Sequence, residues 1–111
     1  MNNIEKAKKV VQCFSTGDVG VAKEFLSDDY VQHNLVFKTG KETFIEIIEG
    51  LNSHLNLDTT ISSINEFEEG NYVVLHSLYK FPGLEKQEVF DVFRFENGKI
   101  VEHWDAIEEY V

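Results

Sequence analysis

The chain has 111 residues, of which 42% are hydrophobic, enough for one folded domain spanning residues 1–111 with a single core. It carries 20 acidic and 10 basic side chains, a formal charge of −10 at pH 7. That charge disfavours nucleic acids and anionic membranes as partners, because phosphates are attracted by Lys and Arg.

The N-terminal residues have the pattern of two successive helices. Apolar residues between Ile4 and Phe14 recur at helical spacing. Asn2 and Glu5 have the spacing of a capping pair, and Gly17 is a natural end for the helix. Asp18 is expected to cap a second helix, whose apolar face follows directly.

A short extended segment and a third helix are predicted next. The polar residues 27–29 are expected to end the second helix, and residues 30–37 are expected to be extended. Thr39 and Glu42 form a capping-box pattern, and the apolar periodicity that follows reaches Leu55.

The second half of the chain changes to the alternating pattern of strands. Strands are predicted over residues 57–68, 72–81, 87–95 and 100–110. Ile61 and Ile64 lie three residues apart, which breaks the alternation and predicts a bulge. Asn97-Gly98 is a strong hairpin-turn signal. Helices followed by a run of antiparallel strands predict an α+β fold with helices on one face of a curved sheet.

Several ionisable residues are expected to face inward from these strands. Asp91 alternates with apolar residues, so its row is predicted to be buried, and a buried carboxylate must be hydrogen-bonded, ion-paired or protonated. His103 and Asp105 share one face of the last strand. His33 and His76 also have apolar neighbours and are expected to join this cluster.

A carboxylate and an imidazole in a dry cavity are suited to general acid–base chemistry. The alternative is that these residues are satisfied polar groups of the core without a function. No metal is expected, because the chain has no His-x-His or His-Glu-x-x-His spacing. The single cysteine, Cys13, excludes a disulfide within the chain and is interpreted as a packing residue of the first helix.

Trp104 is predicted to lie on the face of the sheet opposite His103 and Asp105. Phe90 and Val92 share that face on the neighbouring strand, so helices on the other side would leave an apolar patch. We therefore expect a homodimer formed through this face. The charged N-terminus and the absence of an apolar run of ~20 residues predict a cytoplasmic protein.

Motifs spread along the chain resemble those of SnoaL-like proteins, which belong to the nuclear transport factor 2-like superfamily. The segments that carry the resemblance are Tyr30-Val-Gln-His33-Asn34, Gly40-Lys-Glu, Gly70-Asn-Tyr-Val-Val-Leu-His76-Ser, Phe90-Asp91-Val-Phe-Arg94-Phe and Asn97-Gly-Lys-Ile-Val-Glu-His103-Trp104-Asp105. The resemblance implies three N-terminal helices packed on a strongly curved antiparallel sheet that forms a cone-shaped barrel. It also implies a pocket between the helices and the sheet, and commonly a dimer.

Characterised members of this group close an aldol ring in polyketide aromatics without a metal or cofactor. The resemblance implies that Asp105 is the acid–base residue and that Asp91 faces it, as an aspartate does in ketosteroid isomerases of the same fold. His103 is expected to be a proton donor or an orienting group. The residues expected to line the pocket and contact substrate are His33, His76, Tyr30 and Phe93.

Two hypotheses follow from these residues. The first is a cofactor-free lyase or isomerase that acts on a small apolar or carbonyl-containing molecule by moving a proton α to the carbonyl. The second is a non-catalytic module of the same fold that binds a small ligand or a partner protein. Fold resemblance alone does not choose between them.

Overall fold

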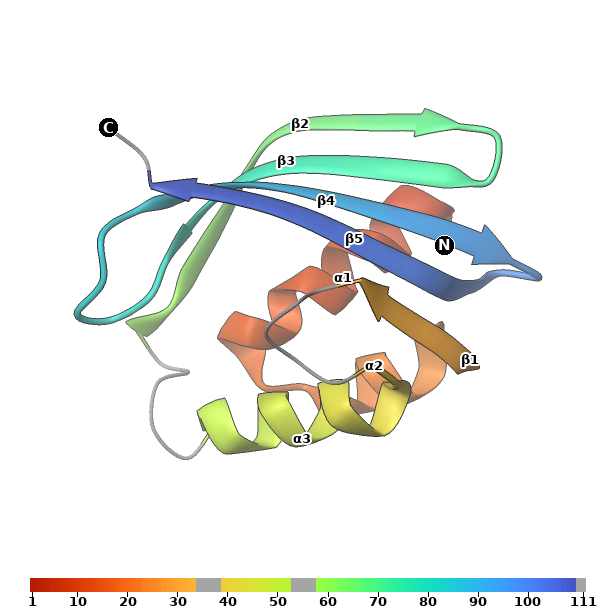
Figure 1. The fold of residues 1–111 in the computed structure, drawn as a ribbon, viewed down its shortest axis with the longest axis horizontal. Coiled ribbons are helices and arrows are strands. Elements are labelled where there is room, and N and C mark those ends of the chain that lie inside the picture. Colours follow the sequence, from red (N-terminus) through yellow and green to blue (C-terminus); the bar gives the residue numbers. More distant parts are fainter. Residues whose placement is uncertain (34–38, 53–57, 110–111) are drawn as a thin grey trace.

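The protein is a layer of helices on one side of a curved sheet, in a computed structural model that describes residues 1–33, 39–52 and 58–109 (Figure 1). In these ranges the elements are α1 (Asn3–Thr16), α2 (Val19–Phe25), β1 (Leu26–His33), α3 (Lys41–Asn52), β2 (Thr60–Glu69), β3 (Tyr72–Lys80), β4 (Gln87–Glu96) and β5 (Lys99–Glu109). The predicted α+β class is confirmed. The predictions for Phe37, Leu55, Leu57 and Tyr110 fall outside the described residues.

The first two helices begin and end where their capping residues predict. The Asn2 side chain accepts a hydrogen bond from the backbone N–H of Glu5 at 2.8 Å, and Gly17 takes the left-handed conformation that ends α1. The Asp18 side chain accepts from the backbone N–H of Gly20 at 3.1 Å. The Thr39 hydroxyl, expected to cap α3, accepts a hydrogen bond from a residue of β1.

The sheet is mixed and open, which corrects the expected antiparallel barrel. Its strand order is β1-β5-β4-β3-β2; β1 runs parallel to β5 and the other neighbouring strands are antiparallel. The chain leaves α2 directly into β1 at Leu26, earlier than predicted, and this strand joins the edge beside β5. β1 and β2 are the two edges of this sheet.

Two predicted irregularities are present in the sheet. The pairing of β2 with β3 shifts between Ser63 and Asn65, which confirms the bulge near Ile64. Asn97 and Gly98 both have positive φ and form the turn between β4 and β5.

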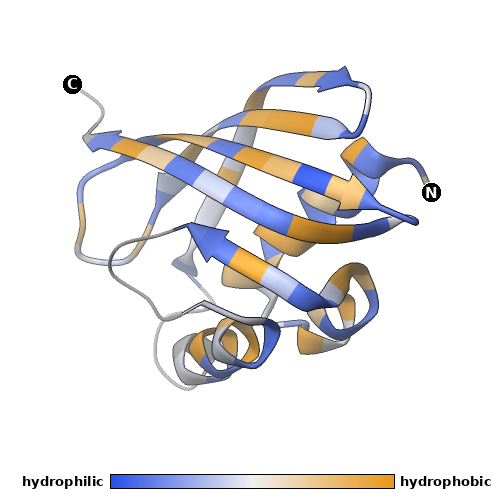
Figure 2. Cartoon of the chain, turned by 45° about the vertical axis from the view of Figure 1, so that its right-hand side comes forward, coloured by the Kyte–Doolittle hydropathy of each residue, from blue (hydrophilic) through white to orange (hydrophobic). Residues whose placement is uncertain are grey.

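The core lies between the helices and the inner face of the sheet. Strands β3 and β4 contribute alternate, fully buried residues to it, and Figure 2 shows hydrophobic and hydrophilic segments alternating along the strands. The fully buried side chains of the core include Val10, Leu26, Ile48, Val73, Leu75, Val89, Phe93, Phe95 and Ile100. Among the described residues, no helix is long and apolar enough to cross a membrane.

Candidate active site

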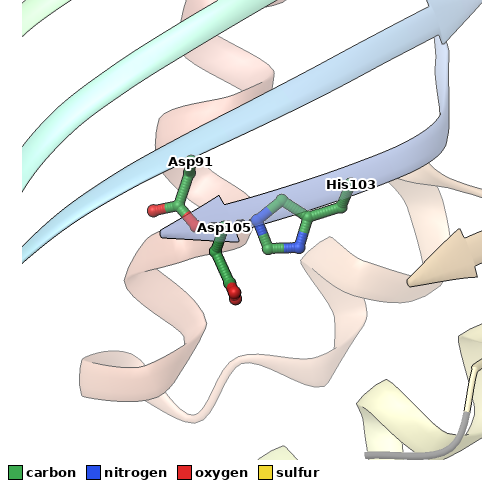
Figure 3. A group of neighbouring side chains, drawn as sticks. All are labelled: Asp91, His103 and Asp105. Atoms are coloured by element: carbon green, nitrogen blue, oxygen red, sulfur yellow. Dashed lines mark hydrogen bonds and ion pairs between the residues drawn. The ribbon is translucent and has the colours of Figure 1, made fainter. Parts of the chain in front are cut away.

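Strand register brings three ionisable residues together on the inner face of the sheet. Asp91 on β4 pairs directly with Asp105 on β5. His103 lies two residues before Asp105 and therefore points to the same face. One ligand atom from each of the three lies within 4.8 Å of the others, and Figure 3 shows the two carboxylates and the imidazole converging.

Asp91 and His103 form a buried pair. Asp91 Oδ1 and His103 Nε2 are 2.7 Å apart, and the two residues are 2% and 7% exposed. The Tyr79 hydroxyl on β3 donates to the other oxygen of Asp91, Oδ2, at 2.6 Å. The Phe93 ring stacks on the imidazole, with 4.4 Å between ring centroids. Both oxygens of Asp91 are therefore engaged, and the imidazole is held from one side by an aromatic ring.

Strand β1 holds the opposite end of the imidazole. Gln32 pairs with His103 in the parallel register, and its Oε1 lies 2.8 Å from His103 Nδ1. The Tyr30 hydroxyl donates to the same oxygen. The backbone N–H of Gln32 donates to Thr39 Oγ1 at 2.8 Å, which fixes the strand at this point. The result is a continuous chain of side chains: Tyr30, Gln32, His103, Asp91 and Tyr79.

The two tyrosines at the ends of this chain stay protonated. Burial is the main cause that raises the pKa of the Tyr30 and Tyr79 hydroxyls, and the negative charges of Asp91 and Asp105 raise it further. Both hydroxyls are therefore hydrogen-bond donors. Among the described residues, no buried side-chain nitrogen or oxygen lacks a hydrogen-bond partner, so the network is fully satisfied.

Asp105 differs from Asp91 in its surroundings. It is only partly buried, whereas Asp91 is almost fully buried. Its carboxylate lies beside the Asp91–His103 pair and is directed toward the helix side of the sheet (Figure 3). A partly exposed carboxylate next to a buried pair that holds a proton is an arrangement suited to proton transfer.

The family follows from a match over most of the chain. Residues 7–103 match the model of the SnoaL-like domain. The chain belongs to the SnoaL-like domain family. No curated protein matches this SnoaL-like domain.

Solved structures share the fold of this SnoaL-like domain at low sequence identity. An NTF2-like protein of unknown function from Cytophaga hutchinsonii is 16% identical, with a TM-score of 0.79 covering 97% of this chain and 91% of its own. IdmH of Streptomyces antibioticus, a candidate polyketide cyclase, is 17% identical, with a TM-score of 0.72 covering 94% of this chain and 90% of its own. An LEH-like epoxide hydrolase of M. tuberculosis is 16% identical, with a TM-score of 0.77 covering 95% of this chain and 81% of its own. At these identities the similarity establishes the fold and not the reaction.

Five of the residues predicted for the site of this SnoaL-like domain lie together. Asp91, His103 and Asp105 form the cluster, Phe93 stacks on the imidazole, and Tyr30 reaches it through Gln32. The alternation of apolar residues around Asp91 identifies the inner face correctly.

The expectation that His33 and His76 face inward is wrong. His33 stacks on Trp104, with 4.8 Å between ring centroids, and its Nε2 lies 2.8 Å from Glu102. His76 pairs with Phe90 rather than with Asp91. Both histidines lie on the outer face. Their apolar neighbours are misleading, because the outer face of the sheet is itself rich in apolar and aromatic side chains.

Two residues of the network are absent from the predicted site. Period-two alternation places Tyr79 on the face of its strand opposite to His76, but no role is predicted for it. Gln32 lies within the segment 30–34, and no role is predicted for it either. Tyr79 is within reach of sequence reasoning, because it shares its face with Val73, Leu75 and Ser77, a row with mostly apolar neighbours. Gln32 is not, because its position depends on the parallel pairing of β1 with β5.

The cluster also has the donor types of a metal site. Asp91, His103 and Asp105 offer two oxygens and one nitrogen within 4.8 Å. A hydrogen bond of 2.7 Å already joins Asp91 Oδ1 to His103 Nε2, so a cation would have to replace the proton between them. The geometry of this pair is that of a proton-holding site.

Proposed function

We propose that this SnoaL-like domain is a cofactor-free small-molecule enzyme of the polyketide cyclase or aldol-condensation type, a lyase or an isomerase. The observation that supports this most is the position of the Asp105 carboxylate beside the buried Asp91–His103 pair. The two carboxylates of this SnoaL-like domain differ in burial, which suits different roles: the more exposed Asp105 as the base and the buried Asp91 as the residue that holds a proton.

In the proposed reaction Asp105 removes a proton from the carbon α to a carbonyl. The C–H electron pair moves into the new C–C double bond, and the carbonyl electrons move to oxygen, which gives an enolate. In an aldol closure the enolate carbon attacks a second carbonyl of the same molecule, and the proton held by Asp105 passes to the resulting alkoxide. In an isomerase the same proton returns to a more distant carbon. Both reactions balance without an oxidant, a reductant or a metal.

The Asp91–His103 pair supports this reaction electrostatically. Its proton lies close to Asp105 and to any carbonyl oxygen bound there, where it opposes the negative charge that develops. Both side chains are nearly inaccessible, so we assign them orienting and charge-stabilising roles rather than direct contact with most of the substrate. A small, uncharged carbonyl compound suits a site that holds two carboxylates.

Deuterium exchange tests the proposed reaction class with simple probes in place of the natural substrate. The probes are small cyclic monoketones and β-ketoesters incubated with the protein in D2O, and the readout is loss of the α-proton signal in the NMR spectrum. Wild type is expected to accelerate exchange for part of this panel. Asp105→Asn is expected to lower the rate by about 100-fold or more, since general base catalysis contributes about that much.

The matched control for Asp105→Asn is Asp29→Asn, which makes the same change at an exposed position of β1. This variant is expected to exchange at the wild-type rate. Binding of the probes with no acceleration of exchange in wild type would contradict the enzyme proposal and favour the ligand-binding module.

We also propose that this SnoaL-like domain forms a homodimer through its outer sheet face. Phe90 is 41% exposed and stacks on His76, and Trp104 stacks on His33 on the same face. The charges beside these rings are already paired within the chain, as His76 is with Glu88, so the face can be covered without leaving them unpaired. Light scattering at micromolar concentration is expected to give a dimer for wild type and a monomer for Phe90→Glu. A monomeric wild type would contradict the proposal.

A further inference from the structure

We propose that Gln32 is a positioning residue that keeps a second proton on the Asp91–His103 pair. The inference deepens the proposed function, because the proton count of the pair sets the charge that Asp105 faces. It stands on the geometry of the hydrogen-bond chain, and it is testable without any substrate.

The proton count begins with what each atom can do. A Gln Oε1 atom only accepts hydrogen bonds. Gln32 Oε1 lies 2.8 Å from His103 Nδ1, so Nδ1 must carry a proton to bond to it. The Tyr30 hydroxyl donates its proton to the same oxygen, which therefore accepts from both groups.

The second ring nitrogen faces a carboxylate. His103 Nε2 lies 2.7 Å from Asp91 Oδ1, so one proton lies between these two atoms, on either side. Asp91 Oδ2 accepts from the Tyr79 hydroxyl, which has no second proton to supply. The pair therefore holds two protons, one on Nδ1 and one between Nε2 and Oδ1, and its net charge is zero.

Without the acceptor at position 32 the count changes. A histidine that donates only through Nε2 to an ionised Asp91 needs no proton on Nδ1, and the pair then has a net charge of −1. Asp105, whose ligand atom lies within 4.8 Å of the pair, would face a second negative charge. Among the described residues, the titratable groups found to contact or influence the pair from the strands around it are Tyr30, Tyr79 and Asp105. Because the two tyrosines stay protonated, neither supplies a compensating charge.

The position of Gln32 is built into the sheet. Gln32 pairs with His103 in the parallel register of β1 and β5, and its backbone N–H is held by Thr39. The register of β1 against β5 therefore places the Gln32 side chain against the His103 imidazole whether or not a molecule is bound. Gln32 does not need to contact the substrate to act, which is what distinguishes a positioning residue from a catalytic one.

The test is the protonation of the His103 ring, read from the nitrogen shifts of the protein labelled with ¹⁵N-histidine. The His103 signals are identified by their loss in His103→Phe. In wild type we expect the Nδ1 signal of a protonated nitrogen. In Gln32→Leu, measured at the same pH, we expect the Nδ1 signal of an unprotonated nitrogen, with the proton retained on Nε2.

Two further variants separate positioning from a general effect on structure. Gln32→Glu keeps an acceptor at the same place and is expected to restore the wild-type Nδ1 signal. Gln12→Leu removes a side-chain amide that donates to the Ile61 carbonyl elsewhere in the molecule, and it is expected to leave the His103 signals unchanged.

An unprotonated Nδ1 in wild type would overturn the proposal, and this result does not depend on whether Gln32→Leu folds. A protonated Nδ1 in folded Gln32→Leu would also overturn it. Either result would leave the role of Asp105 untouched, because that role is tested by deuterium exchange. Conversely, absence of exchange in wild type would remove the proposed function without changing the expected nitrogen signals.

Discussion

The buried Asp91–His103 pair allows a test of how far two side chains of the cluster depend on each other for stability. The perturbation is a cycle of three variants: Asp91→Leu, His103→Leu and the double variant. In Asp91→Leu the Tyr79 hydroxyl and the His103 ring both lose a buried acceptor. In His103→Leu the Asp91 carboxylate loses the imidazole and keeps the Tyr79 hydroxyl as a donor.

The expected magnitudes follow from these lost partners. Removing one member of a buried pair costs about 3–5 kcal/mol in the free energy of unfolding, because a charge is left uncompensated. In the double variant neither charge of the pair remains. Gln32 Oε1 keeps the Tyr30 hydroxyl as donor, and the Tyr79 hydroxyl is left without its acceptor, at a cost of about 1–3 kcal/mol. The double variant should therefore be more stable than either single variant.

Urea unfolding followed by circular dichroism measures all three free energies, with the slope checked for constancy across the variants. A double variant that loses the sum of the two single losses would refute the reasoning, because it would show that the two side chains do not depend on each other. An Asp91→Leu variant as stable as wild type would refute the assigned hydrogen bonds.

The alkaline side of the stability profile is expected to report the buried tyrosines. Folding raises the pKa values of Tyr30 and Tyr79 above 10, so above about pH 10 the unfolded chain loses these protons first. The free energy of unfolding then falls by about 1.4 kcal/mol per pH unit for each tyrosine. Tyr79→Phe should make the free energy of urea unfolding depend less on pH in this range, and an unchanged dependence would contradict this. The acidic side of the profile is expected to report Glu102, whose pKa is lowered first by the hydrogen bond from His33 and then by Arg94. Its contribution to stability is present above the pKa of the unfolded chain and is lost as the pH falls through the lowered pKa of the folded protein. Glu102→Gln should remove part of the stability loss seen below about pH 4.5, and an acid profile identical to wild type would contradict this. Burial raises the pKa of the Cys13 thiol to about 12, so a thiol reagent at neutral pH should leave the native protein unmodified and react after unfolding; fast modification of the native state would contradict the packing role.

The elements of the fold are predictable because their signals are local. The Asn2 cap, the Gly17 stop and the Asn97-Gly98 turn depend on residues within a few positions of one another, and each is present. The inner row of Asp91 is predictable for a similar reason, since period-two alternation with apolar residues identifies a buried face of a strand.

The remaining features depend on contacts that alternation does not encode. The sequence predicts an extended segment over residues 30–37 but not that β1 joins β5 in parallel. The contact of Gln32 with His103 therefore cannot be predicted from the sequence. Alternation assigns His76 to the wrong face because both faces of β3 carry apolar residues, and only the register with Phe90 decides between them. The site residues on the β4–β5 hairpin are therefore predicted correctly, whereas the roles of Gln32 on β1 and Tyr79 on β3 are not.

The most direct test of the proposed function is the rate of α-deuterium incorporation into the carbonyl probes by Asp105→Asn and Asp29→Asn at equal protein concentration. The account predicts a loss of about 100-fold or more for Asp105→Asn, with the wild-type rate for Asp29→Asn. Equal rates for the two variants would contradict the assignment of Asp105 as the base.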